Sequence, residues 1–192
     1  MDNVSDDPRL AAILNSAFQA FAAYGFRKTS MDDIAKGAGM SRPAVYLHFK
    51  NKEAIVRALT RQYYDQKIAL VAQALQGDGP VPQVLDRAIQ AQSEGMAAIL
   101  ASPHGLEMLD ATKSMSTDIV EQGEGELTAL YADWLRREGA AGRARLLMGA
   151  DETARTITAA LKGIKMTAPG AEEFEQRIAQ LAALLGAGLE VR

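Results

Sequence analysis

The segment 41–52 holds the side chains whose chemistry best suits contact with DNA. It reads Ser-Arg-Pro-Ala-Val-Tyr-Leu-His-Phe-Lys-Asn-Lys, a short helix followed by the start of another. Arg42 can make a bidentate contact with a guanine edge. The hydroxyl of Tyr46 can reach a phosphate, and Leu47 can contact a thymine methyl group. Further candidates for phosphate or groove contacts are Thr29, Ser41, Ala44, His48 and Lys52.

These side chains need a scaffold that presents one helix, and residues 30–50 have the spacing of a helix-turn-helix. Ala35 is small enough for two helices to approach, and Gly39 tolerates the positive φ of a tight turn. Ser41 can cap the second helix, whose first turn accepts Pro43. The apolar residues that can pack behind the exposed face are Ile34, Met40, Val45 and Phe49.

Taken one at a time, the exposed polar residues have an ordinary explanation. Arg42, Tyr46 or His48 alone is usually a solvated surface residue. The combination of a small residue, a turn glycine, a cap, a proline and an aromatic side chain at this spacing favours DNA binding instead.

The charge of the chain is divided unevenly along its length. Residues 9–52 contain seven Lys/Arg and two Asp, whereas residues 53–192 contain 14 Lys/Arg and 19 Asp/Glu. Residues 1–8 add three Asp, and the net charge is −3. A basic head on an acidic body is the asymmetry expected when only one end meets phosphate.

Helical spacing of apolar residues extends through the rest of the chain, without strand alternation or repeats. We predict an all-α fold with an N-terminal three-helix helix-turn-helix domain, residues 1–52, and a C-terminal helical domain, residues 53–192. Glycine and proline breaks separate the expected helices. These are 9–24, a short helix ending near 37, a short helix after Ser41, 52–76, 82–101, 105–112, 117–137, 151–166 and 171–188.

Composition argues against several classes of function. There are no cysteines, so disulfides, thiolate zinc sites and cysteine nucleophiles are excluded. His48 and His104 are far apart in sequence, and we expect His104 to be a surface cap rather than a metal ligand. We therefore expect neither enzyme activity nor a cofactor. No run approaches the ~20 apolar residues of a membrane span, and the acidic residues 1–8 do not resemble a secretory signal.

Four stretches in the N-terminal part of the chain are together typical of one known family. They are Ala-Phe-Gln-Ala-Phe-Ala-Ala-Tyr-Gly-Phe at 17–26, Thr-Ser-Met-Asp-Asp-Ile-Ala at 29–35, Gly-Met-Ser at 39–41 and Val-Tyr-Leu-His-Phe-Lys-Asn-Lys-Glu at 45–53. They resemble the DNA-binding domain of the TetR (tetracycline repressor) family. The resemblance places DNA contacts on Thr29, Ser30, Ser41, Arg42, Pro43, Ala44, Tyr46, Leu47, His48 and Lys52.

The resemblance implies a bacterial, cytoplasmic homodimer that binds a near-palindromic DNA operator. Each recognition helix would enter a major groove, about one DNA turn from its twin. Residues 53–192 would bind a small-molecule effector, and the last two long helices would dimerise. Apolar stripes on those helices agree with a dimer interface, although one chain could also pack them into its own bundle. The stripe residues are Ile157, Leu161, Ile164, Phe174, Ile178, Leu181 and Leu185.

Methionines, which adapt to irregular cavities, and aromatic side chains with one polar group are the candidates for an effector pocket. Each of them could equally be a plain core residue. A basic effector would need buried acids, for which Glu94, Glu107 and Asp110 are the central candidates. An apolar or weakly polar effector is favoured. The pocket candidates are Met96, Met108, Met115, Tyr131 and Trp134.

These observations lead to one preferred interpretation and two rivals. The preferred one is a ligand-responsive repressor, whose effector tilts the helix 52–76 and changes the separation of the two DNA-binding domains. The first rival is a DNA-binding regulator without a small-molecule effector, architectural or controlled by a protein partner, whose body would have a filled core. The second rival is an enzyme, for which the sequence offers neither a nucleophile with a base nor a metal cluster.

Overall fold

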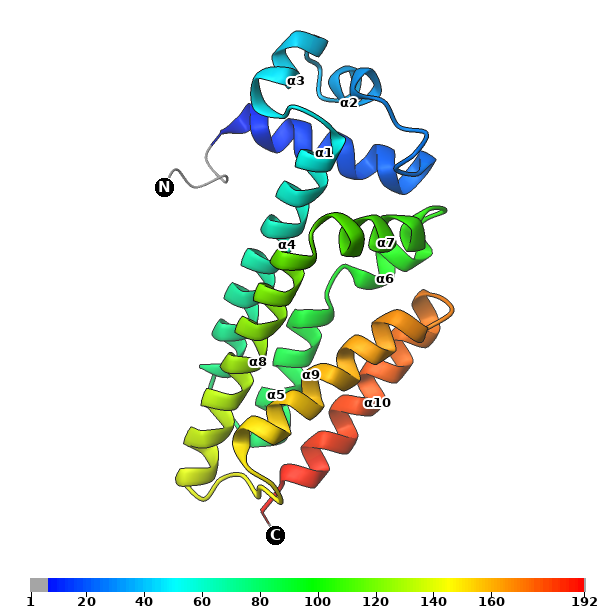
Figure 1. The fold of residues 1–192 in the computed structure, drawn as a ribbon. Helices are drawn as coiled ribbons and strands as arrows, with labels where there is room; N and C mark the ends of the chain where they lie inside the picture. The colour runs from blue at the N-terminus through cyan, green and yellow to red at the C-terminus, as the bar shows by residue number, and fades with distance from the viewer. Residues whose placement is uncertain (1–6, 192) are drawn as a thin grey trace. The chain divides into compact units, whose positions relative to one another are not determined.

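The computed structural model describes residues 7–191, and helices make up most of this described chain, which confirms the predicted all-α fold (Figure 1). Ala144 and Glu190 form an isolated antiparallel bridge. Residues 1–6, part of the segment predicted not to be a secretory signal, lie outside the described residues. Across 7–191, no helix combines the length and the apolar character needed to cross a membrane. The helices are α1 (Pro8–Tyr24), α2 (Met31–Gly37), α3 (Arg42–His48), α4 (Lys52–Leu75), α5 (Val81–Ser93), α6 (Met96–Ala101), α7 (Gly105–Met115), α8 (Thr117–Ala140), α9 (Ala150–Thr167) and α10 (Ala171–Leu189).

The single helix predicted for residues 82–101 is wrong, because the chain breaks this segment into α5 and α6. Glu94 leaves the helical region with a ψ of 136°, and Gly95 has a φ of +79°. A positive φ is strained for a residue with a Cβ, so the glycine makes the break possible. Apolar residues keep helical spacing across it, from Ile89 to Met96, and the pattern alone therefore predicts one helix.

Contacts divide the described chain into two compact units. The first contains the described residues up to Tyr63 together with Ile99–Val120, and the second contains Tyr64–Ala98 with the described residues from Glu121 onward. The first unit therefore includes α7 and the start of α8 as well as α1–α3. A functional division at residues 52 and 53 stays a prediction.

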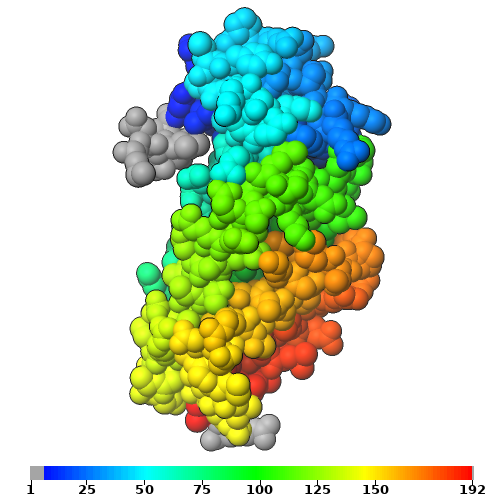
Figure 2. All heavy atoms as spheres, viewed as in Figure 1, coloured from blue at the N-terminus to red at the C-terminus, as the bar shows by residue number. Residues whose placement is uncertain are grey.

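The core of the first unit holds the two short helices α2 and α3 in place. Ile34, Val45 and Phe49, which were predicted to be apolar anchors, are buried there, and Met40 packs against them. Met108 of α7 belongs to the same cluster. Helices of seven residues are not stable alone, so these tertiary contacts must hold them. In the space-filling view the light blue and cyan residues around α3 lie at the surface (Figure 2).

In the second unit, α10 packs against α5 and α9. Part of the stripe predicted to be a dimer interface is buried by this packing within one chain. Packing into the chain's own bundle was the alternative to a dimer that the sequence left open. The buried members of the stripe are Ile157, Leu161, Phe174 and Ile178. Its half-buried members are Ile164, Leu181 and Leu185.

Ser16 and Gly37 mark a close approach of α1 and α2 in the first unit. The Ser16 hydroxyl donates a hydrogen bond to the Ile34 carbonyl (2.8 Å), which places its oxygen directly against Gly37. A Cβ at position 37 would overlap that oxygen. Ala35, the small residue predicted to let the two helices of the helix-turn-helix approach, is also buried.

Gly37→Ala should destabilise the protein by ~1–3 kcal/mol, because its Cβ would force the Ser16 hydroxyl out of place. Urea unfolding should show a smaller loss when G37A is introduced into the S16A background, where the overlapping oxygen is gone. Gly125→Ala is the matched control, since a Cβ at this site in α8 meets nothing within 4 Å. That variant should be neutral or stabilising. An equal loss from G37A in both backgrounds would contradict the steric explanation.

Candidate DNA-binding site

A reciprocal cap fixes the start of α2. The Asp33 N–H donates to the Ser30 hydroxyl oxygen (3.1 Å), and the Ser30 N–H donates to the Asp33 carboxylate (2.8 Å). This capping box satisfies two backbone donors that would otherwise lack a partner. The hydrogen bond from the Ser30 hydroxyl lowers the pKa of Asp33 below its usual value, and the bond from the Ser30 backbone adds to this. Helix α2 therefore begins at a fixed residue.

The turn between α2 and α3 has the geometry expected from its sequence. Gly39 has a φ of +67°, and the Met40 N–H donates to the Ala35 carbonyl (2.9 Å). The Ser41 hydroxyl accepts from the Ala44 N–H (3.4 Å) and caps α3, whose first turn contains Pro43. The predicted turn glycine, cap and proline are thus confirmed as features of the local structure.

Most side chains of α3 face solvent. Leu47 is 87% exposed, although it is large and apolar, and Ala44 is half-buried. Val45 is the buried residue that attaches the helix to the core. The remaining predicted contacts on or beside this face are also exposed, namely Ser30, Ser41, Arg42, Pro43, Tyr46 and His48. Their approach to DNA stays a prediction, and the structure brings them to the surface of one unit.

Arg42 is oriented by its neighbours on α2 and α3. Its guanidinium lies over the Tyr46 ring, 5.5 Å from the ring centroid, and donates to the Tyr46 hydroxyl (3.4 Å). Its Nη1 is 3.4 Å from the Asp32 carboxylate. The pKa of Arg42 is raised first by the Tyr46 hydrogen bond and then by the charge of Asp32. The guanidinium is therefore charged, exposed and presented in one direction.

Two predicted phosphate contacts, Thr29 and Lys52, have internal partners in the structure. Thr29 is only 2% exposed, and its hydroxyl donates to the carbonyl of Gly25 (2.8 Å). The Lys52 ammonium donates to the carbonyls of Phe26 and Thr29 (2.6 Å each) and lies 4.4 Å from the centroid of the Phe26 ring. A phosphate would have to replace these bonds. We therefore interpret both side chains as residues that position the loop between α1 and α2.

The predicted effector-pocket residues are divided between the two compact units. Met108 is buried in the core of the first unit, and Met115 packs against that core. Met96, Tyr131 and Trp134 belong to the second unit, where all three are buried. Burial raises the pKa of Tyr131, whose hydroxyl donates to the Gln92 side chain (2.9 Å). The five residues are parts of two cores.

The second unit has a groove that the sequence pattern did not reveal. It has a volume of about 460 Å³ and lies between the α5–α6 break and the beginning of α10. The pattern predicted one helix across the break and assigned Phe174 and Ile178 to a dimer interface. Glu94, named in the sequence as a candidate acid for a basic effector, is among the residues that line the groove. The signal that could have found it is Gly95, at the break. The lining residues are Gln90, Ala91, Ser93, Glu94, Gly95, Ala97, Phe174, Glu175 and Ile178.

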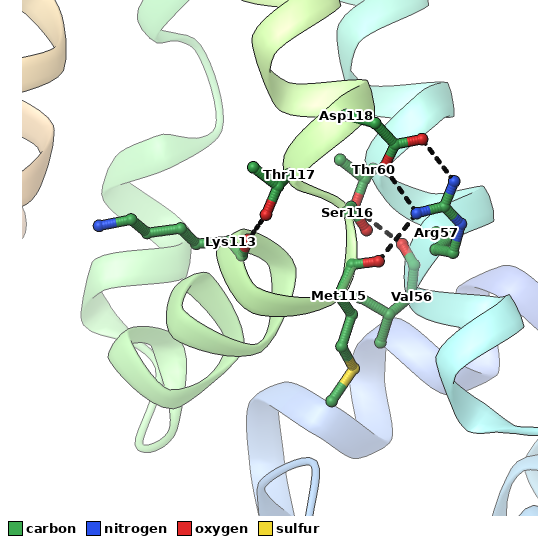
Figure 3. Close-up of polar contacts among 8 residues, drawn as sticks. All are labelled: Val56, Arg57, Thr60, Lys113, Met115, Ser116, Thr117 and Asp118. Atoms are coloured by element: carbon green, nitrogen blue, oxygen red, sulfur yellow. Dashed lines mark hydrogen bonds and ion pairs between the residues drawn. The ribbon is translucent and has the colours of Figure 1, made fainter.

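A polar network, also missed from the sequence, ties α4 to the junction of α7 and α8 within the first unit (Figure 3). Arg57 donates two hydrogen bonds to the Asp118 carboxylate (2.7 Å each) and one to the Met115 carbonyl (2.9 Å). The hydroxyl of Thr60 contacts that of Ser116 (3.2 Å), which is fully buried. The Arg57 hydrogen bonds lower the pKa of Asp118 to about 2. Bidentate geometry makes this a well-directed contact between helices.

Lys52→Met should lower the free energy of unfolding by ~1–3 kcal/mol, because two loop carbonyls lose their donor while the length of the side chain is kept. Lys50→Met is the matched control, since Lys50 is exposed in the same segment and removes the same charge. Urea denaturation of both variants measures the difference. If K50M and K52M unfold at the same urea concentration as the wild type, the positioning role of Lys52 fails.

Comparison with known proteins adds an independent line of evidence. The family model described as bacterial regulatory proteins, tetR family, matches residues 13–59. The transcriptional regulator EthR of Mycolicibacterium smegmatis is 47% identical over 55 residues, which are 29% of this chain and 25% of EthR. The transcriptional repressor Rv1474c of Mycobacterium tuberculosis is 28% identical over 157 residues, 76% of this chain and 75% of Rv1474c. The activator FasR of M. smegmatis is matched over 39% of its length, so this chain spans well under half of EthR and FasR.

Solved structures share the whole fold at low sequence identity. SmeT, the repressor of the Stenotrophomonas maltophilia multidrug efflux pump SmeDEF, superposes with a TM-score of 0.71 at 19% identity, over 98% of this chain and 93% of SmeT. A transcriptional regulator from Cytophaga hutchinsonii gives a TM-score of 0.75 at 18% identity, over 96% of this chain and 100% of that one. The family match covers α2, α3 and most of α1, which present the exposed basic helix. Residues 13–59 of this chain therefore match the tetR family of bacterial regulatory proteins, and the whole chain is similar in fold to solved transcriptional regulators.

Proposed function

We propose that this chain is a cytoplasmic, ligand-responsive transcriptional repressor that binds a near-palindromic DNA operator as a homodimer. The exposed face of α3 carries the proposal. Arg42, Tyr46 and Leu47 all lie in solvent there, on a helix held by a capped turn. An exposed leucine beside an oriented arginine suits a surface that becomes buried against a groove with both polar and methyl groups. The surplus of positive charge in residues 9–52 supports the same partner.

Recognition would place α3 in the major groove of DNA. Arg42 would exchange its contact with Asp32 for the O6 and N7 atoms of a guanine. Ser41 and Tyr46, with the N–H groups at the start of α3, would bind phosphates and set the register. Leu47 or Ala44 would contact a thymine methyl group. Specificity then comes from Arg42 and Leu47, and orientation from the residues that contact phosphate.

Selection of bound DNA from a random pool should recover a near-palindrome with the wild type, and Arg42→Ala should lose base preference at one position in each half-site. The expected cost is ~1–3 kcal/mol at that position, because a bidentate base contact is removed. Arg9→Ala is the control, since Arg9 is exposed on α1 and carries the same charge. If wild type and R42A select identical motifs, Arg42 does not contact bases in the groove. If the wild type enriches no motif at all, sequence-specific DNA recognition is refuted.

Dimerisation would use the outward faces of α9 and α10. Met166 of α9 is 46% exposed, and Leu184 of α10 is 66% exposed. The buried residues on the inward faces of the two helices pack within the chain, so the outward faces are the part left for a second copy. A single DNA-binding domain makes few contacts, whereas two linked domains combine the affinities of two half-sites.

Leu184→Glu should convert a dimer into a monomer, because it places a charge in the middle of the proposed interface. Sedimentation velocity measures the mass, and operator binding should weaken in parallel because the half-sites no longer act together. Leu106→Glu on α7 is the matched control, as Leu106 is also exposed, at 61%. A dimeric L184E protein would contradict this interface.

The groove at the α5–α6 break is the place where an effector would bind. Phe174 and Ile178 provide apolar contact, and Gln90 and Ser93 provide polar groups. Glu94 and Glu175 also line the groove, but both are exposed and so are not the buried acids that a basic effector would need; the lining suits an apolar or weakly polar molecule. SmeT is described as the repressor of a multidrug efflux pump, and another fold neighbour, FadR of Bacillus halodurans, as a regulator of fatty acid degradation. Binding would release DNA only if the groove has a higher affinity for the effector in the DNA-free conformation.

A regulator without a small-molecule effector is the second candidate. The burial of Met96, Tyr131 and Trp134 favours it, because these residues are packed as in a filled core. The Tyr131 hydroxyl already has a partner in Gln92. A compound that raises the melting temperature of the protein and also releases operator DNA would support the effector hypothesis over this one.

A further inference from the structure

The loop between α1 and α2 is held from two sides within the first unit. Lys52 of α4 donates to the carbonyls of Phe26 and Thr29. On α7, Glu107 accepts from the Arg27 N–H (3.2 Å). The loop leads directly into Ser30, the N-cap of α2. The position of α2, and of α3 after it, therefore depends on where this loop is fixed.

The Glu107 carboxylate lies in the space that a Cβ at position 25 would occupy, and the residue there is glycine. Gly25 has a φ of +85°, and a Cβ there would lie 2.6 Å from the Glu107 Oε2 atom. The same oxygen is 3.2 Å from Nδ1 of His104, while Oε1 accepts from the Arg27 N–H. The Arg27 hydrogen bond is the main reason why the pKa of Glu107 lies below its usual value, and the His104 side chain adds to this. Both oxygens thus have partners.

Helix α7 also contacts the end of α1 through its backbone. The His104 N–H, at the N-cap of α7, donates to the Ala22 carbonyl (3.2 Å). One turn further along, Met108 is buried in the core that supports α2 and α3. Glu107 therefore lies between two other attachments of α7 to the DNA-binding helices. It is not available as a pocket acid, the role that the sequence suggested for it.

We propose that Glu107 is a positioning residue for DNA binding, which holds the loop at Gly25–Arg27 and through it sets the orientation of α2 and α3. This inference rests on the proposed DNA-binding function. Without the Glu107 acceptor, Lys52 still binds the Phe26 and Thr29 carbonyls on either side of Arg27, but the Arg27 N–H loses its partner and the loop is held from one side alone. Only the fraction of molecules with the competent arrangement then binds tightly, so the apparent dissociation constant rises by the inverse of that fraction.

Substitutions at Glu107 separate three properties of the side chain: the oxygen that accepts from the Arg27 N–H, the length of the side chain and its negative charge. Glu107→Gln keeps an oxygen that can accept from Arg27, and its amide can donate to His104. Glu107→Leu removes the acceptor, and Glu107→Asp keeps the charge but shortens the side chain by one methylene. Asp110→Asn is the matched control, because Asp110 is exposed on the same helix and its carboxylate makes no hydrogen bond or ion pair among the described residues. It removes the same charge as E107Q.

Binding to the selected operator and amide hydrogen exchange of the DNA-free protein are the two measurements. E107L and E107D should bind the operator about tenfold more weakly, with faster exchange at the Arg27 N–H. E107Q and D110N should match the wild type in both measurements. E107D retains the charge and most of the side chain, so it keeps the test available if E107L does not fold. Rescue by Gln but not by Asp is a result that a general loss of stability would not produce.

Two results would overturn the inference. One is operator binding and Arg27 exchange in E107L and E107D that equal those of the wild type. The other is an E107Q protein that binds as weakly as E107L, which would show that charge rather than the acceptor matters. Failure of the wild type to select any DNA would instead refute the proposed function, so the two failures are distinguishable.

Discussion

The hydrogen bonds of one lysine ammonium fix the geometry on which the proposed DNA-binding unit depends. Lys52, at the first residue of α4, donates to two carbonyls of the α1–α2 loop and covers the face of Phe26. Those carbonyls belong to an irregular segment, where no helix supplies them with N–H donors. The Lys52 ammonium supplies the donor instead, and a hydrogen bond from a charged donor is stronger than one from a neutral donor. The loop then sets the cap of α2, and α2 sets the turn before α3. The position of every side chain proposed to touch DNA therefore depends on this contact.

Much of this unit could be predicted from the sequence, because its signals are local. The Ser30 and Ser41 caps, the positive φ of Gly39 and the place of Pro43 each depend on residues within one turn. The roles of Thr29 and Lys52 could not be predicted in the same way. A lysine beside a basic helix has the same sequence signature whether it binds a phosphate or a carbonyl of its own chain. Glu107 is further from prediction still, since its partner Arg27 is 80 residues away.

The body of the chain shows a second limit of sequence patterns. An apolar stripe records that one face of a helix is buried, but not whether its partner is in the same chain. Phe174 and Ile178 are buried within their own chain, so the stripe that resembled a dimer interface is largely internal. The break at Gly95 had a signal, a glycine within a helical pattern, but continued apolar spacing outweighed it. The groove beside it followed from that break and was missed with it.

The shortness of α3 bears on where DNA affinity can be controlled. A helix of seven residues has too few internal hydrogen bonds to hold its shape, so Val45, Phe49 and the turn at Gly39 must hold it. Its exposed residues can be changed without disturbing that support, which makes α3 suited to set sequence preference. The supports themselves lie in α4, α7 and the loop between α1 and α2. Met108 of α7 is buried in the core that holds α3, and Glu107 of α7 binds the loop between α1 and α2, so a shift in α7 would act on the supports of α3. Under the proposed function, the exposed residues of α3 would set the sequence preference, and the supports of α3 would set the fraction of molecules able to bind.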